Sequence, residues 1–251
     1  MSDMNDLKLA VLIDADNISY KNIKGIMEEI TKYGTPTIKR IYGDWTAPTV
    51  SGWKSVLLEN AITPIQQYSY TTGKNSTDSA LIIDAMDILY TDRVDGFCIL
   101  SSDSDFTRLA TRLRESGLKV YGFGERKTPE PFRVSCDKFT YVEIIPSKSA
   151  EVSKADTHDE AGPAAEPTTD QIDQEIVKLI ADSVEDIADE HGWAFLAGVG
   201  NMILKKKPDF DPRNYGFSKL TPLVKSLDRF EIDARKSADS NVKLIYIRNR
   251  D

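Results

Sequence analysis

The stretch Leu9-Ala10-Val11-Leu12-Ile13-Asp14 carries the strongest signal for the fold of this chain. Five consecutive apolar residues closed by an acid are typical of a strand that is buried on both faces of a parallel sheet. Apolar residues then recur at helical spacing between Ile23 and Ile30, and Gly34 and Pro36 end that segment. The first forty residues therefore predict a strand followed by a helix.

The same alternation continues to about residue 145. Further strands are predicted at 38–42, 64–68, 96–100, 119–123 and 141–145, and further helices around 53–57, 76–90 and 106–116. Repeated alternation predicts an α/β fold with a mainly parallel sheet and helices on both faces. Ligands of such sheets bind beyond the carboxyl ends of the strands.

The composition changes after Pro146. Residues 147–169 are rich in Ala, Glu, Asp, Ser and Pro, which predicts a flexible linker between one domain at 1–146 and another at 170–251. In the second domain, helical patterns at 172–180, 196–206 and 217–227 precede two β segments, 230–232 and 242–247. Helices followed by such a hairpin predict a small winged helix, a nucleic-acid-binding variant of the helix-turn-helix.

Bulk composition restricts the class of protein. No apolar run is long enough to cross a bilayer, and the first residues are acidic where a signal peptide is basic. We therefore expect a cytoplasmic protein without membrane contact. The net charge of −8 argues at first sight against a nucleic-acid partner. A protein that holds divalent metal must concentrate acids, however, so local patches decide this question.

Carboxylates lie where the predicted fold would bring them together. Asp14 ends the first strand, Asp103 and Asp105 follow the strand 96–100, and Asp78 opens a helix after a polar loop. Carboxylates gathered at one place repel each other. Mg²⁺ or Mn²⁺ compensates such repulsion, because these hard cations prefer oxygen ligands. The sequence therefore predicts a magnesium or manganese site at the edge of the sheet.

Each acid alone has an equally good explanation as a helix cap, because Asp between a strand and a helix often accepts hydrogen bonds from the first helical turn. Their combination favours a site. Asp16 points away from Asp14 if the strand geometry continues. Asp84 lies on a different side of its helix from Asp78, and we predict it to be a solvated surface acid.

Three blocks of the first domain resemble the motifs of NYN domains, and the LabA-like bacterial group in particular. They are Val11 to Asn17, Lys74 to Asp78 and Leu100 to Phe106, within a resemblance that covers residues 8–145. It implies a PIN-like fold and metal-dependent ribonuclease chemistry. It also implies metal-binding, catalytic acids at Asp14, Asp78, Asp103 and Asp105, with Asn17 orienting the first carboxylate. The segment 128–135 departs from the family pattern, which leaves its role open.

The run Phe210 to Leu220, Phe-Asp-Pro-Arg-Asn-Tyr-Gly-Phe-Ser-Lys-Leu, resembles the OST-HTH domain, also called LOTUS. This resemblance covers about residues 170–249 and implies RNA binding, with a protein partner as the less favoured use. A basic edge that follows phosphates is predicted there, although a solvated helix end explains any one lysine equally well. The candidate RNA contacts are Lys74 in the first domain and Lys205, Lys206, Lys207, Arg213 and Lys219 in the second.

The leading hypothesis is therefore a Mg²⁺- or Mn²⁺-dependent endoribonuclease that hydrolyses RNA phosphodiester bonds and is targeted by its second domain. One alternative is a non-catalytic RNA-binding or regulatory protein. Another is a haloacid-dehalogenase-like phosphatase, with Asp14 as nucleophile and Asp16 as acid, but Asn17 and the helix of Asp78 favour the nuclease. The sequence leaves the oligomeric state open, including a homo-oligomer.

Overall fold

The computed structural model describes residues 6–47, 50, 52–68, 76–146, 170–236 and 243–250. The chain divides into two compact units, Met1–Pro163 and Ala164–Asp251. Lys74 and the segment 147–169, predicted to be a linker, lie outside the described residues. The linker and its boundaries therefore stay predictions.

The first unit is built on a parallel sheet of six strands in the order β3-β2-β1-β4-β5-β6. The strands are β1 (Lys8–Asp14), β2 (Thr35–Gly43), β3 (Thr63–Gln66), β4 (Gly96–Leu100), β5 (Lys119–Gly124) and β6 (Lys138–Tyr141). The strand order reverses at β1 and β4, because the chain returns from the edge strand β3 to pair beside β1. This switch point places the carboxyl ends of β1 and β4 side by side, where ligands of such sheets bind.

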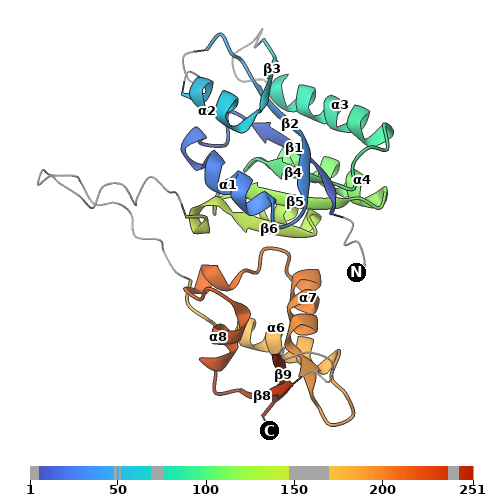
Figure 1. Ribbon diagram of the computed structural model, residues 1–251, viewed down its shortest axis with the longest axis vertical. Coiled ribbons are helices and arrows are strands. Elements are labelled where there is room, and N and C mark those ends of the chain that lie inside the picture. Colours follow the sequence, from blue (N-terminus) through green and yellow to red (C-terminus); the bar gives the residue numbers. More distant parts are fainter. Residues whose placement is uncertain are drawn as a thin grey trace, which may run out of the picture. The chain divides into compact units, whose positions relative to one another are not determined.

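Helices cover both faces of this sheet, so the predicted α/β class is confirmed. They are α1 (Ile23–Ile30), α2 (Trp53–Asn60), α3 (Ser76–Tyr90), α4 (Thr107–Glu115) and α5 (Glu130–Ser135), with short 3₁₀ turns η1 (Tyr20–Asn22), η3 (Ser104–Phe106) and η4 (Val142–Ile144). Helices α1 and α2 pack on one face, and α3 and α4 on the other (Figure 1). Alternate side chains of Leu9 to Ile13 enter the two cores, which explains why the whole run is apolar.

The end of this unit differs from the prediction. The last strand is β6, and most of the predicted strand 141–145 forms η4 instead. Asp137 sets this register, because its N–H donates to the Val120 carbonyl at 2.8 Å and its carboxylate accepts a hydrogen bond from the Val120 N–H at 2.9 Å. The segment 128–135, whose role was open, contains the short helix α5, and Phe132 packs from it into the core.

The second unit has the helices and hairpin that the sequence predicts, and one strand more. Its elements are α6 (Gln174–Glu185), β7 (Ala194–Phe195), α7 (Leu196–Lys206), the 3₁₀ turn η7 (Pro212–Tyr215), α8 (Leu220–Lys225), β8 (Phe230–Lys236) and β9 (Lys243–Asn249). The sheet is antiparallel in the order β7-β9-β8. Helix α8 begins later than predicted, because Gly216 adopts a φ of 80° and ends η7 first.

Apolar side chains from all three helices and the sheet form the core of the second unit. Ile180, Val199, Leu223 and Ile247 have no exposed surface within it. Tyr215 is buried and Phe217 packs against this core, so the two aromatic residues of the run Phe210 to Leu220 that flank Gly216 serve the packing of the unit. No helix in the described parts of the chain has both the length and the apolarity that a membrane crossing requires.

Candidate metal centre

Asp14 ends β1 and is fully buried. Its Oδ2 accepts hydrogen bonds from Asn17 Nδ2 at 2.6 Å and from Ser101 Oγ at 2.8 Å, and its Oδ1 accepts one from the Asp16 N–H at 3.1 Å. Burial raises the pKa of Asp14 above its ordinary value, and these hydrogen bonds act in the opposite direction. The carboxylate is therefore held in one orientation from both sides of the switch point.

Ser101 links Asp14 to the acids that follow β4. Its buried hydroxyl donates to Asp14 and accepts a hydrogen bond from the Asp103 N–H at 3.1 Å. The next turn is closed by Asp103, whose Oδ1 accepts from the Asp105 N–H at 2.9 Å and caps η3. Asp103 can therefore cap η3 and belong to a metal site at the same time. The sequence analysis did not single out Ser101, although it stands inside the Ser-Ser-Asp-Ser-Asp block.

Asp78 meets these acids from the first turn of α3. Asp78, Asp103 and Asp105 each offer a carboxylate oxygen, and the three atoms lie within 4.8 Å of one another. Burial, and after it repulsion from Asp14, Asp103, Asp105 and Asp16, together raise the pKa of Asp78 to about 6. The site therefore concentrates negative charge at the switch point of the sheet.

The four predicted acids take unequal positions in this centre. Asp78, Asp103 and Asp105 form the close group, whereas Asp14 lies near enough to repel Asp78 but has both oxygens hydrogen-bonded within the protein. Asp16 is exposed. A group of carboxylate oxygens at this spacing fits a hard divalent cation such as Mg²⁺ or Mn²⁺, which binds oxygen ligands and retains water molecules.

Asp84 is not the solvated surface acid that the helix pattern predicted. Its carboxylate accepts hydrogen bonds from the Arg40 guanidinium and the Tyr42 hydroxyl, both on β2, and its side chain is 20% exposed. Burial and the neighbouring Asp84 raise the pKa of Tyr42 above its ordinary value. The three residues fasten α3 to the sheet six residues after Asp78. Arg40 and Tyr42 stand two residues apart on one strand and therefore share a face of the sheet, and this spacing was the signal in the sequence for a polar contact there.

We expect Asp84→Ala to lower the free energy of unfolding by about 2 kcal/mol, because it leaves a guanidinium and a buried hydroxyl without their partner. Chemical denaturation measures this loss. Asp87→Ala is the matched control, since Asp87 is exposed on the same helix, and its effect should stay within about 0.5 kcal/mol. Equal losses in the two variants would contradict a fastening role for Asp84.

The lysines at the end of α7 are not equivalent. Lys205 is exposed, whereas Lys206 Nζ lies 2.6 Å from Asp186 Oδ2 and Lys207 Nζ lies 3.6 Å from Asp209 Oδ1. These ion pairs neutralise part of the predicted basic edge. Lys205 is therefore the member of this run best suited to a phosphate.

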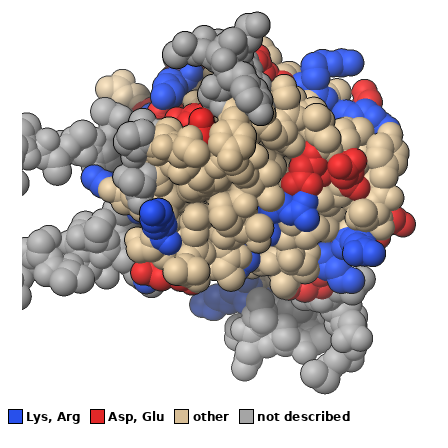
Figure 2. All heavy atoms as spheres, turned by 90° about the horizontal axis from the view of Figure 1, so that it is seen from above, with Lys and Arg blue, Asp and Glu red and all other residues tan. Residues whose placement is uncertain are grey.

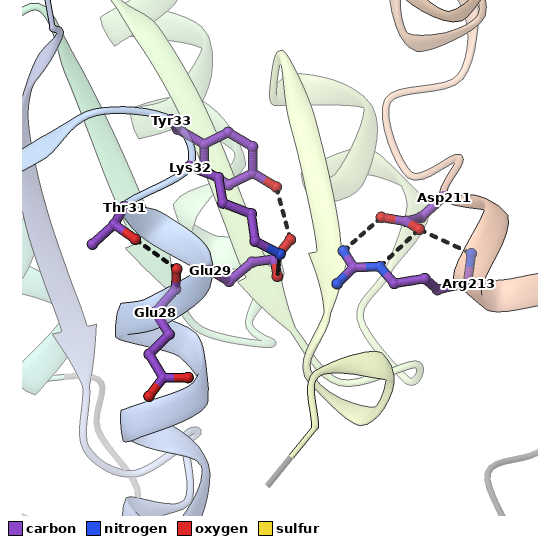
Figure 3. A network of polar contacts seen from close by, with 7 residues as sticks. All are labelled: Glu28, Glu29, Thr31, Lys32, Tyr33, Asp211 and Arg213. Atoms are coloured by element: carbon purple, nitrogen blue, oxygen red, sulfur yellow. Dashed lines mark hydrogen bonds and ion pairs between the residues drawn. The ribbon is translucent and has the colours of Figure 1, made fainter. Parts of the chain in front are cut away.

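Arg213 is tied to its own turn. Its Nη2 lies 2.7 Å from Asp211 Oδ2 and its Nε donates to Asp211 Oδ1 at 3.0 Å, as Figure 3 shows. Asp211 is buried and also caps η7. Two hydrogen bonds to a buried carboxylate indicate that the Arg213 guanidinium stabilises this turn before it serves any RNA contact. Lys219, also predicted to contact RNA, is exposed.

Charge on the face drawn in Figure 2 is mixed, with acidic and basic side chains interspersed on a mainly uncharged surface. The net charge of −8 is therefore not spread there as a uniform acidic coat. Long-range repulsion of a polyanion depends on such local distribution. That local patches matter more than net charge stays a prediction.

Comparisons with known proteins extend these observations. A family model described as the NYN domain matches residues 8–144, and one described as the OST-HTH/LOTUS domain matches residues 167–242. Among curated proteins, none matches this chain.

Solved structures with partial similarity include proteins from three organisms. A protein of unknown function from Vibrio parahaemolyticus is 20% identical with a TM-score of 0.47, over 56% of this chain and 96% of that one. An uncharacterized protein from Nitrosomonas europaea is 36% identical with a TM-score of 0.30, over 38% and 90%. A protein fragment from Chromobacterium violaceum is 31% identical with a TM-score of 0.27, over 31% and 83%.

The two family matches agree in order and position with the two units of the structure. The first match spans more than half of the 251 residues. The chain therefore belongs to the NYN-domain family, and it carries an OST-HTH/LOTUS domain after the NYN domain.

Proposed function

We propose that the protein is a metal-dependent endoribonuclease whose NYN domain hydrolyses RNA phosphodiester bonds. The observation that carries this proposal is the group formed by Asp78, Asp103 and Asp105, with oxygen atoms within 4.8 Å of one another at the switch point of the sheet. The pKa of Asp78, raised to about 6, supports the proposal further, because it reflects repulsion among the acids that a bound cation would relieve. The OST-HTH/LOTUS domain supplies an RNA-binding partner for the site.

Each acid has a distinct part in this proposal. Asp78, Asp103 and Asp105 would hold Mg²⁺ or Mn²⁺, which when bound supplies Lewis acidity and lowers the pKa of a coordinated water. Asp14 positions the group, because Ser101 ties its carboxylate to the backbone of Asp103. Asn17 keeps Asp14 in its orientation.

The second domain raises the local concentration of RNA at the first. Two binding modules in one chain convert the second contact into an intramolecular event, so affinity rises without a new contact. The isolated NYN domain should then still cleave RNA, but only at higher substrate concentration. Protein binding by the second domain is the less favoured use.

Phosphatase chemistry at Asp14 is disfavoured by the surroundings of this residue. A nucleophilic carboxylate must reach phosphorus, whereas Asp14 has no exposed surface and both of its oxygens accept hydrogen bonds. Asp16, the acid in that alternative, is exposed. The non-catalytic alternative is decided by a cleavage assay of the parent protein on mixed RNAs with Mg²⁺ and Mn²⁺.

We expect Asp78→Asn to stabilise the metal-free protein at neutral pH by about 1 kcal/mol. A pKa shift of about two units in Asp78 corresponds to roughly 3 kcal/mol without screening, and partial solvation of the site reduces this effect. The pKa of Asp78 is raised in the folded state from 3.8 to about 6, so folding takes up protons. Stability of the parent therefore falls as pH rises between these values. The stabilising effect of Asp78→Asn should appear across that window.

Thermal unfolding in EDTA at pH 4, near the lower end of the window, and at pH 7.5, above its upper end, measures this effect. Adding Mn²⁺ should then raise the melting temperature of the parent and leave that of Asp78→Asn nearly unchanged. Asp87→Asn, on the exposed side of the same helix, is the control and should behave as the parent. A metal-induced shift of equal size in Asp78→Asn would remove Asp78 from the metal centre.

A further inference from the structure

The outer face of the sheet in the second unit carries aromatic side chains. In β8 and β9, the alternate residues Ile232, Ile245 and Ile247 pack with the core. Their neighbours therefore point to the opposite face. On that face Phe195 of β7 stands directly opposite Tyr246 of β9. An outer sheet face usually carries polar side chains, so these rings require an explanation.

Rings and guanidinium groups form one continuous layer on this side. The ring centroids of Phe195 and Tyr246 are 5.7 Å apart, and the Arg235 guanidinium lies 4.2 Å from the centre of the Tyr246 ring. Arg235 also lies 5.1 Å, and Arg248 4.9 Å, from the centre of the Trp193 ring. We call Trp193, Phe195, Arg235, Tyr246 and Arg248 the stacking face. Phe195 is 41% exposed, so the layer is open to a ligand.

The loop before β7 places the Trp193 side of this face. Asp189 Oδ1 accepts hydrogen bonds from the N–H groups of His191 and Trp193, both at 2.9 Å. Gly192 has a φ of 77°, and a Cβ atom there would lie 3.2 Å from Cδ of Arg248. The glycine thus lets the turn form and leaves room for the arginine that crosses it.

Acids of β8 orient both arginines. Arg235 Nε lies 2.9 Å from Asp233 Oδ2, and Arg248 Nη2 lies 2.5 Å from Glu231 Oε2. Their side chains nevertheless remain 39% and 40% exposed. A guanidinium held in place beside a ring presents a flat cationic surface at little further entropic cost.

Each arginine of the stacking face is paired with an acid of β8, so its flat aromatic and guanidinium surface, and not a surplus of charge, distinguishes it. Strand β9 also lies beyond the part of the chain that the OST-HTH/LOTUS model matches, which ends at residue 242. Tyr246 and Arg248 of the stacking face therefore lie outside the family match, whereas Trp193, Phe195 and Arg235 lie within it.

We propose that the stacking face binds unpaired RNA bases, with rings and guanidinium planes stacking on them. This inference rests on the proposed function, and it names single-stranded RNA as the class of ligand. Aromatic rings and arginine planes stack on any exposed base, and this recognition tolerates any sequence. A duplex keeps its base faces inside the helix, so it offers the stacking face only its backbone.

The test compares a short oligouridine strand with a blunt-ended RNA duplex of equal length. Binding of the full chain is measured by fluorescence anisotropy in EDTA, so that cleavage does not interfere. Phe195→Leu keeps an apolar side chain and removes the ring, and Arg235→Lys keeps the charge and removes the plane. Each should weaken oligouridine binding about tenfold and change duplex binding by less than about twofold.

The control variant is Tyr90→Leu, which removes a ring that is 73% exposed on α3 of the NYN domain and should leave both affinities unchanged. Melting temperatures show that each variant is folded. Unchanged oligouridine affinity in both Phe195→Leu and Arg235→Lys would overturn the inference and leave the face to a protein partner. Equal weakening for both RNAs would also overturn it, since only the backbone would then be recognised.

The failure of the proposed function has a different signature. If the parent protein binds neither RNA, the RNA-directed function fails, and the stacking face fails with it. If the parent binds oligouridine and the variants bind it equally well, only the stacking face fails. Cleavage activity is measured separately with Mn²⁺ and does not enter this comparison.

Discussion

Asp103→Asn is expected to reduce metal-dependent RNA cleavage by more than about a hundredfold, because loss of a residue that merely supports a metal ligand already costs ten- to 100-fold. The substitution removes one charge and keeps the shape of the side chain. The amide oxygen can still accept the hydrogen bond from the Asp105 N–H that closes η3. The turn should therefore survive, and RNA affinity should stay near that of the parent protein.

Single-turnover cleavage of a mixed RNA pool with Mg²⁺ and Mn²⁺ measures this loss, and anisotropy in EDTA measures the affinity. Asp87→Asn is the matched control, because it makes the same chemical change at an exposed position. Equal cleavage by Asp103→Asn and the parent would rule out the nuclease assignment. Phosphatase activity that disappears in Asp14→Asn, with a trapped acyl phosphate in the parent, would instead support the alternative.

Reversing Lys205, Lys206 and Lys207 to Glu is expected to weaken RNA binding by about a hundredfold at moderate salt. With fewer phosphate contacts, binding of the variant releases fewer counterions from the RNA. The slope of log affinity against log salt should become shallower by up to about 2. Maximal turnover at saturating RNA should change little, since these lysines belong to the second domain and the acids to the first. Affinity measured over a series of salt concentrations tests all three expectations.

The structure refines this experiment. Lys206 and Lys207 form ion pairs with Asp186 and Asp209, so reversing them also places like charges together. Lys205→Glu alone should then retain a large share of the effect without that penalty. Lys178→Glu, at an exposed position of α6, is the control for net charge. Affinity and salt slope that stay unchanged in the triple variant would mean that this edge is only solvated surface.

Local pattern was sufficient for most of the architecture. The continuous apolar run before Asp14 and the alternating strands and helices after it predict a parallel sheet covered on both faces, and the structure confirms this. The prediction of the last strand of the first unit was wrong in its position, because the strand forms at 138–141 and not at 141–145. Residues 141–145 are as apolar as a strand requires, but Asp137 pairs with Val120 and sets the register of β6 earlier.

The candidate site was predictable as a set of residues but not as an arrangement. Acids at the ends of β1 and β4 must share one edge of a parallel sheet, and this follows from sequence order and topology alone. Which acids stand close together depends on hydrogen bonds between segments far apart in the chain. Ser101 reaches Asp14 across 87 positions, and no periodicity encodes that contact.

The sequence by itself determined the order of strands and helices, the two family resemblances and the acids that face one edge, because these depend on neighbours along the chain. Only the tertiary structure separated Asp14 from the group of Asp78, Asp103 and Asp105, and only it paired Asp84 with β2. It also brought Trp193 beside Arg235 and Arg248. Such pairings are decided by register and packing between distant segments, where a shift of one residue reverses the face that a side chain occupies.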